Sequence, residues 1–391
     1  MSTNTDDQEQ VQSDNLQGAH LATQPRHPLL SRLAYGGSLY AIQVLGGPLM
    51  WLADWYPWFY PPTFAPTIVK TYACRPSLPT RIFFPKSYDR ESSQTPLPTL
   101  ITIHGGGFCL GRTNEDDEWN ARFADTHHVL VVSLEYRKAP YYPFPTALHD
   151  VEALILAVFD DESLPVDKSR IALTGFSAGG NLSLTVCQLP SIRDKVKPSA
   201  ALPVYPVVDQ SVAQEFAIKT RYYKPDLGPG GRSKPTDFLA WMVPAFGWAY
   251  INPGQSLEDP LISPIYAPRD ALPPHLFFVG AELDQLAHGA WRMASKLAGR
   301  PVPSLTEKVG QQELAPKPGQ LILDDERFAF EHVDEDGKSS VRWLLVPDQL
   351  HGFDRLPWSW HGSAESVEDA KLKEVAYQKV MGEWLRDFVW K

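Results

Sequence analysis

Residues Gly175-Phe176-Ser177-Ala178-Gly179 decide the fold of this 391-residue chain. They follow RIALT (170–174), an apolar β-branched run, and precede NLSLTVCQL (181–189), a run of helix-forming residues. A strand, Gly-x-Ser-x-Gly and a helix in that order make a sharp turn that exposes the serine hydroxyl at the edge of a sheet. Because Gly-x-Ser-x-Gly alone also occurs in ordinary turns, the flanks carry the prediction that Ser177 is a nucleophile.

A second glycine-rich stretch, His104-Gly105-Gly106-Gly107-Phe108, directly follows the strand-like LITI (100–103). Three glycines let the backbone approach a ligand closely, and their N–H groups can point at one oxygen. We expect the amides of Gly106, Gly107 and Ala178 to form an oxyanion hole for acyl transfer. A phosphate-binding loop is the rival interpretation, but no Gly-Lys-Ser/Thr ending or G-x-G-x-x-G pattern can be aligned here.

A catalytic serine needs a general base and an acid that orients this base. Asp284 and His351 each come just after a predicted strand, where open α/β sheets gather their active sites. We therefore predict that His351 acts as general base and then acid, and that Asp284 fixes its tautomer. Glu282 and Asp348 remain as substitutes for Asp284.

The sequence predicts neither a metal site nor a cofactor. It contains no HExxH or CxxC motif. His127 and His128 are adjacent and would point to opposite faces of an extended chain, which makes them a poor pair of ligands.

Eight apolar, β-branched runs have the pattern of strands. Helical patterns such as ALHDVEALILAVF (147–159) and GAWRMASKLAG (289–299) lie between several of them. This alternation predicts an α/β fold in which helices cover both faces of a mostly parallel sheet. The runs are IVKTYACR (68–75), TRIFFP (80–85), LPTLITIH (97–104), HHVLVVSLEY (127–136), RIALTGF (170–176), ALPVYPV (201–207), HLFFVGA (275–281) and VRWLLV (341–346).

Two stretches interrupt the alternation within the catalytic domain, which we expect over 67–391. Residues 210–260 contain a Gly/Pro-rich turn and then the helix candidate FLAWMVPAFGWAY (238–250), and we expect a lid there. Residues 300–345 include two alternating runs around Asp-Glu-Asp-Gly (334–337). An Asp-Gly turn of this kind predicts an extra hairpin at the sheet edge.

The N-terminal region divides into a polar stretch and an apolar one. Residues 1–27 are polar and predict a disordered tail, whereas 28–66 are expected to form a cap, with a membrane-associated helix over 33–60 as the alternative. Two glycine pairs and Pro48 favour broken helices packed on the lid. Such a cap would bury Leu33, Tyr40, Leu45, Met50, Trp51 and Trp55.

Four ordered motifs resemble those of the hormone-sensitive-lipase-like α/β-hydrolases, a group that includes many microbial and fungal carboxylesterases. The resemblance extends from about residue 97 to the end of the chain, and it implies an eight-stranded, mostly parallel sheet, an N-terminal cap, cofactor-free ester hydrolysis and the triad named above. Phe176 departs from it, because the group usually has an acidic residue there, and the insert before the histidine strand is long. The motifs are 104–108, 136–140 with 143–150, 175–182 and 351–353.

Composition narrows the expected partners. Acidic residues outnumber basic ones by 46 to 36, which gives a net charge of -10, and no Lys/Arg-rich stretch is present, so nucleic acid is not expected. Three cysteines and the absence of a secretory signal pattern predict a cytoplasmic protein, with membrane association as the alternative.

We expect a serine carboxylester hydrolase that acts on an apolar small-molecule ester. A lyase, cyclase or acyltransferase on the same scaffold is the alternative, because the same base and oxyanion hole can abstract a proton next to a carbonyl. A ligand-binding receptor is a third class, and the presence of His351 argues against it, since the plant hormone receptors that resemble this group lack the histidine.

Overall fold

The computed structural model describes residues 19–59, 63–93, 95–355 and 358–391, and the side chains of 47–59 and 358–359 lie outside that description. Most of the predicted tail is therefore not described. His20 and Thr23, however, form isolated β-bridges with the lid residues Val212 and Ser256. The end of the polar stretch is thus attached to the body.

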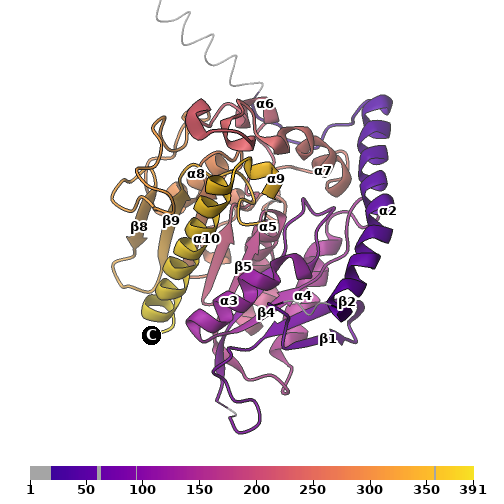
Figure 1. The fold of residues 1–391 in the computed structure, drawn as a ribbon, viewed down its shortest axis with the longest axis vertical. Helices are drawn as coiled ribbons and strands as arrows, with labels where there is room; N and C mark the ends of the chain where they lie inside the picture. Colours follow the sequence, from indigo (N-terminus) through magenta and orange to yellow (C-terminus); the bar gives the residue numbers. More distant parts are fainter. Residues whose placement is uncertain (1–18, 60–62, 94, 356–357) are drawn as a thin grey trace, which may run out of the picture.

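Nine strands of the described chain form one sheet in the order β1-β2-β4-β3-β5-β6-β7-β9-β8 (Figure 1). The central strands β4, β3, β5, β6, β7 and β9 run parallel to one another. The strands β1, β2 and β8 at the edges pair antiparallel with their neighbours. This confirms the predicted mostly parallel α/β sheet. The strands are β1 (Ile68–Tyr72), β2 (Arg75–Phe83), β3 (Leu97–Ile103), β4 (Leu130–Leu134), β5 (Val166–Phe176), β6 (Ala200–Val204), β7 (His275–Ala281), β8 (Ala329–Val333) and β9 (Ser340–Val346).

The sheet has nine strands rather than the eight that the family resemblance implies, because β8 lies beyond β9. The two strands pair antiparallel from Ala329 with Leu344 to Val333 with Ser340, on either side of the Asp-Gly turn. The long insert before the histidine strand therefore ends as an edge hairpin.

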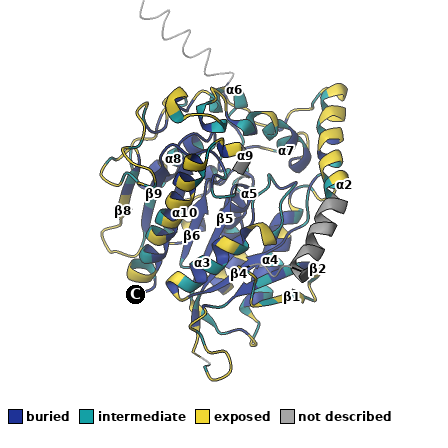
Figure 2. Ribbon diagram, viewed as in Figure 1, coloured by how far each residue is buried: buried dark blue, intermediate teal, exposed yellow. Residues whose placement is uncertain are grey.

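Helices cover both faces of the sheet, as Figure 1 shows. Successive strand side chains point to opposite faces, so Phe277 packs with α10 in one core cluster while Phe278 packs with α8 in another. Figure 2 shows the sheet buried between these layers. The helices that pack on it are α3 (Asp117–His127), α4 (Thr146–Phe159), α5 (Ala178–Thr185), α8 (Ala287–Leu297) and α10 (Ala364–Trp384).

The connection between β6 and β7 contains the predicted lid segment, residues 210–260, which is called the lid below and is built from short helices and turns. The aromatic helix candidate 238–250 is divided in two at Met242, because Pro244 lacks an amide hydrogen and fits only the first turn of a helix. The short elements of the chain are η1 (Thr113–Asp116), η2 (Val186–Gln188), η3 (Ser191–Val196), α6 (Gln214–Ala217), η4 (Pro225–Leu227), η5 (Gly231–Ser233), η6 (Phe238–Trp241), α7 (Val243–Tyr250), η7 (Pro264–Tyr266), η8 (Arg269–Ala271), α9 (Trp358–His361) and η9 (Leu385–Val389).

The helix α2 (Leu29–Phe59) is continuous over 31 residues, so the expectation of broken helices was wrong. Tertiary packing outweighs the poor helix propensity of its glycines. A narrow stripe faces the body: Leu39 is buried, and Gly36 lies against the Trp248 ring of α7. Gln43 continues this stripe and donates to the carbonyls of Cys109 and Ala139, both at 2.9 Å.

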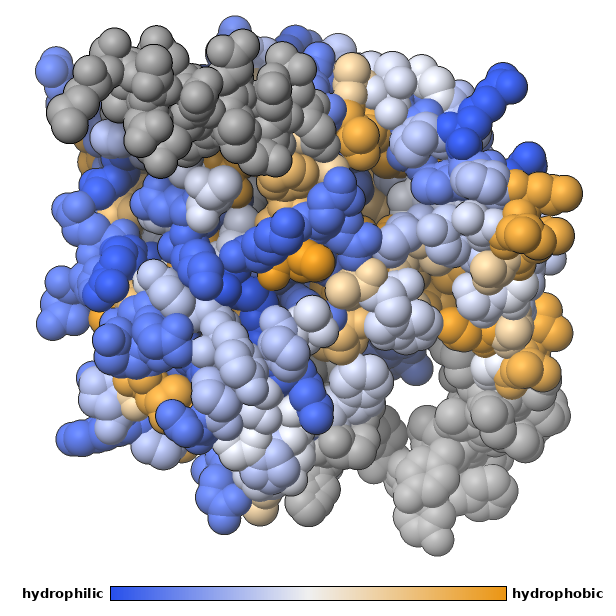
Figure 3. Space-filling model, turned by 90° about the horizontal axis from the view of Figure 1, so that it is seen from above, coloured by the Kyte–Doolittle hydropathy of each residue, from blue (hydrophilic) through white to orange (hydrophobic). Residues whose placement is uncertain are grey.

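The rest of α2 is more exposed than predicted. Leu33 and Leu45 were expected to be buried, but they are 63% and 70% exposed because only the narrow stripe contacts the body. Tyr40 is half-buried, and Met50, Trp51 and Trp55 fall outside the described side chains. Figure 3 shows hydrophobic side chains gathered on the side of the molecule that α2 occupies. Among the helices that the structure describes, none is long and apolar enough to cross a membrane.

The glycine stripe gives a test of how α2 is held. A side chain at Gly36 must grow into the Trp248 ring, since even its Cβ would lie 3.2 Å from the ring, whereas a Cβ at Gly37 meets nothing within 4 Å. Both Gly36→Leu and Gly37→Leu improve the helix propensity of α2 by about the same amount, so we expect Gly36→Leu to be less stable than Gly37→Leu by about 1–3 kcal/mol because of the contact with Trp248. Urea unfolding of both variants measures this, and equal midpoints would contradict the described packing.

Candidate active site

Ser177 lies at the turn between β5 and α5, with φ 56° and ψ −114°. Positive φ is unfavourable for a residue with a side chain, and such strain is typical of a nucleophile at this kind of turn. The two flanking glycines are required by space: a Cβ at Gly175 would overlap the carbonyl of Gly179, and one at Gly179 would overlap the carbonyl of Ile103.

The glycine-rich loop of residues 104–108, the predicted oxyanion loop, passes beside this turn. Gly106 and Gly107 have φ values of 108° and 59°, and both line the same cavity as Ser177. A Cβ at Gly107 would overlap the Phe246 ring of α7, so the lid packs directly on this loop. Ala178, the third predicted donor, is the first residue of α5 and follows Ser177 directly.

The side chain of His104 holds the loop through contacts with Glu135 and Tyr136. Its Nε2 lies 2.8 Å from Glu135 Oε1, and its ring stacks on that of Tyr136 with the centroids 4.3 Å apart. The nearby Lys138 ammonium also bonds to Glu135. The histidine of the motif therefore anchors the loop through a buried carboxylate, away from the cavity.

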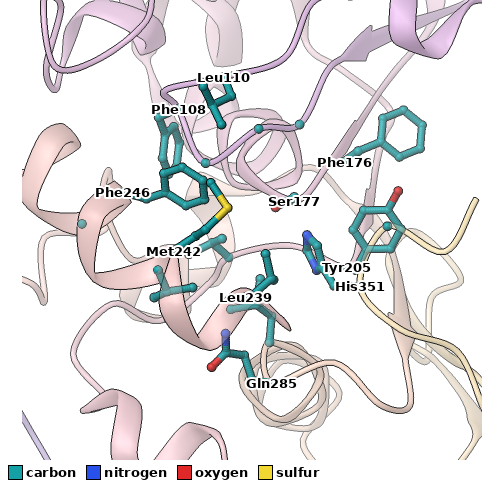
Figure 4. A pocket seen from close by; sticks show the side chains of 18 of the residues that line it. Phe108, Leu110, Phe176, Ser177, Tyr205, Leu239, Met242, Phe246, Gln285 and His351 are labelled. Atoms are coloured by element: carbon teal, nitrogen blue, oxygen red, sulfur yellow. The ribbon is translucent and has the colours of Figure 1, made fainter. Parts of the chain in front are cut away.

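Asp284 and His351 are in direct contact. His351 Nδ1 lies 2.7 Å from Asp284 Oδ2, and both side chains are buried. A second bond fixes the carboxylate, because Asp284 Oδ1 accepts from the Leu286 amide at 2.8 Å. Figure 4 shows side chains that line the cavity. Ser177 and His351 face the same space in it.

Opposing effects set the pKa of His351. Burial lowers it, but the negative charge and hydrogen bond of Asp284 stabilise the imidazolium more strongly, so the net pKa is raised above 6.5. A raised pKa makes the imidazole a stronger proton acceptor than an isolated histidine.

The two alternative acids, Glu282 and Asp348, are engaged elsewhere. Lys224 of the lid has no exposed side-chain surface, and its ammonium lies 2.8 Å from Glu282 Oε2 and 2.7 Å from Asp348 Oδ1. It also donates to the carbonyl of Glu313 at 2.8 Å. Glu282 Oε2 in turn accepts from the Asp348 amide. This network, called the Lys224 cluster below, joins the lid and the long insert to the loops that carry Asp284 and His351.

Other lid residues contact the loop that carries Asp284. Arg221 donates to the carbonyl of Leu283 at 2.8 Å, and Asp237 accepts from the amide of Gln285 at 2.9 Å. Burial, followed by repulsion from Asp284, raises the pKa of Asp237 to about 6. Sequence reasoning missed Lys224, Arg221 and Asp237, because charged residues of an irregular segment carry no signal that they are buried.

The cavity has a volume of about 310 Å³, in the range of small-molecule sites. Lid side chains form much of its wall, and Met242 and Phe246 lie opposite His351 in Figure 4. Polar side chains line it as well, among them Asp116 and Arg355, which form an ion pair, and Tyr205, whose hydroxyl accepts from Arg355. The apolar wall residues are Phe108, Leu110, Val212, Ala217, Phe238, Leu239, Met242, Val243, Phe246 and Tyr250.

No group of three or more His, Cys, Asp or Glu side chains that could hold a metal ion occurs in the described part of the chain.

Residues 100–312, more than half of the chain, match a protein-family model described as alpha/beta hydrolase fold. The chain belongs to the hormone-sensitive-lipase-like carboxylesterases. It is 31% identical over 234 residues to an arylesterase of Saccharolobus solfataricus, a match covering 59% of this chain and 70% of the relative. It is 30% identical over 213 residues to the carboxylesterase NlhH of Mycobacterium tuberculosis, covering 54% and 61% respectively.

The fold is shared with solved esterases. The hyperthermophilic esterase of Pyrobaculum calidifontis superposes with a TM-score of 0.58 at 22% identity, covering 92% of this chain and 99% of that one. The named relatives of this family member include an arylesterase and a carboxylesterase, which supports carboxylic ester hydrolysis as its activity class.

The Lys224 cluster can be tested directly. Lys224→Met would leave two buried carboxylates without a counter-ion, which typically costs about 3–5 kcal/mol. We expect a corresponding decrease in the free energy of unfolding, measured with urea, and a lower kcat. Lys219→Met is the matched control, because Lys219 is an exposed lysine of the same segment. Equal stability of the two variants would show that the cluster does not hold the loops.

Proposed function

We propose that this protein hydrolyses carboxylic esters through an acyl-enzyme on Ser177, with His351 as the general base and Asp284 as the orienting acid. The 2.7 Å bond between His351 Nδ1 and Asp284 Oδ2 carries the proposal. It leaves Nε2 of the same ring for the serine, and the nearby strained turn presents Ser177 to the same cavity.

In the acylation step, the Ser177 hydroxyl oxygen attacks the ester carbonyl carbon while His351 Nε2 takes the hydroxyl proton. The carbonyl oxygen gains negative charge, which the amides of Gly106, Gly107 and Ala178 are proposed to stabilise. The bond to the alcohol oxygen then breaks, and His351 returns the proton to the leaving alcohol.

In the deacylation step, water replaces the alcohol. His351 removes a proton from it, the hydroxide attacks the acyl carbon, and the proton passes to Ser177 as the acid leaves. Throughout both steps Asp284 stabilises the imidazolium by charge and hydrogen bonding without itself becoming protonated.

The substrate is proposed to be an apolar small-molecule ester, because the wall of the cavity is mostly apolar and many of its aromatic and aliphatic side chains come from the lid. Hydrolysis is favoured over lyase, cyclase or acyltransferase chemistry, since the relatives reported above are named esterases. We also propose a cytoplasmic location, because Cys74, Cys109 and Cys187 are free thiols, which suit a reducing compartment.

The triad is tested by single and double variants. Because its members act as a unit, Ser177→Ala and His351→Ala should each lower kcat by about 10³-fold or more, with little further loss when they are combined. Hydrolysis of p-nitrophenyl esters measures this. Glu282→Gln tests the alternative acid: it weakens the Lys224 cluster, but its loss in kcat should be far smaller than that of Asp284→Asn. An active Asp284→Asn enzyme would assign the role of the acid elsewhere.

The pH profile tests the His351–Asp284 pair separately. Hydrolysis requires neutral His351, so kcat/KM should rise with pH through the pKa of His351, and the raised pKa places this rise above 6.5. Asp284→Asn removes the stabilising charge and leaves the effect of burial, so the rise of its residual activity should move to lower pH. A rise at the same pH in both enzymes would be inconsistent with the pairing.

A further inference from the structure

The side chain of Gln285 is buried in the wall of the substrate cavity without a hydrogen-bond partner. It is 3% exposed, and both its Oε1 and its Nε2 are unpaired among the described residues. The main-chain N–H of Gln285 does form a hydrogen bond, which it donates to the carboxylate of Asp237. A glutamine amide offers two donors and an acceptor, and buried groups of this kind are nearly always paired.

The neighbours of Gln285 decide how a partner reaches its covered amide. Gln285 and its neighbour Leu286 line the cavity together with Leu239 of the lid. Figure 4 places the Gln285 amide on the far side of Leu239 from Ser177. The unpaired amide is therefore at a distance from the ester-cleaving groups, and because neighbouring side chains cover both of its atoms, a substrate oxygen reaches it only when a wall side chain such as Leu239 turns aside.

We infer that Gln285 determines specificity by hydrogen-bonding a neutral oxygen, a ketone or hydroxyl, that the substrate carries away from its scissile ester. An anionic substrate group is disfavoured here, because the carboxylates of Asp237 and Asp284 lie close to Gln285 and the one guanidinium described beside this loop, that of Arg221, already donates to the Leu283 carbonyl. The inference rests on the proposed hydrolysis and narrows the substrate from a plain apolar ester to an oxygenated one.

The effect of such a hydrogen bond on selectivity follows from the unpaired state of the Gln285 side chain in the free enzyme. With a hydrocarbon in the cavity the amide stays buried and unpaired, whereas an oxygenated substrate satisfies it. A site built to bond a polar group discriminates strongly against the analogue that lacks this group. Selectivity between matched esters, rather than total activity, is therefore the quantity to measure.

The experiment compares p-nitrophenyl octanoate with its 4-, 5-, 6- and 7-oxo derivatives, which carry the added oxygen in the acyl part. It also compares hexyl acetate with its oxo derivatives, which carry the oxygen in the alcohol part. We expect at least one oxo ester to exceed the plain ester of equal length in kcat/KM by about tenfold. Gln285→Met should bring this ratio close to one. Gln378→Met is the control: Gln378 is also 3% exposed, but it bonds to Glu374 at 2.8 Å and does not line the cavity.

Thermal unfolding adds a second readout. Gln285→Met removes an unpaired polar group and should raise Tm, whereas Gln378→Met breaks a bond and should lower it. A ratio near one for every pair in the parent enzyme, or an unchanged ratio in Gln285→Met, overturns the inference. Either result leaves the proposed function standing as long as hydrolysis of the plain esters still depends on Ser177.

Discussion

The buried ammonium of Lys224 holds together the parts from which the site is assembled. Asp284 follows β7 and His351 follows β9, so their side chains meet only if the two loops keep a fixed separation. Lys224 bonds to one carboxylate in each loop and to the backbone of the insert. Buried charges of this kind contribute little net stability compared with apolar packing, but they are strongly directional. The cluster thus fixes geometry at the point where the proposed chemistry depends on it.

This arrangement also gives the lid a role beyond covering the cavity. Arg221, Lys224 and Asp237 all come from the lid and all bond to the loop around Asp284. Because these bonds are buried, the lid could lift away only by exposing several unpaired charges at once. The lid therefore behaves as part of the wall beside the proposed acid.

Local patterns were enough to predict much of the fold and to nominate the site residues. Each predicted strand had a clear apolar run, and Ser177 was marked by glycines that the backbone needs for space. Asp284 could not be separated from Glu282 by sequence, since the choice depends on which carboxylate Lys224 occupies. The exposure of Leu33 and Leu45 was mispredicted, because hydrophobicity shows that a helix can be buried and does not show how much of it the body covers. Gln285 carried no signal either, since its lack of a partner is a property of the folded cavity.

The bonds from Gln43 have a consequence for how the protein can be shortened. The family match begins at residue 100, and a recombinant protein designed from that boundary would retain most strands of the sheet and the residues of the proposed triad. It would lose α2, however, and with it the amide that satisfies the carbonyls of Cys109 and Ala139 beside the oxyanion loop. The smallest unit that keeps this loop supported is therefore larger than the unit defined by sequence similarity, and it begins before Gln43.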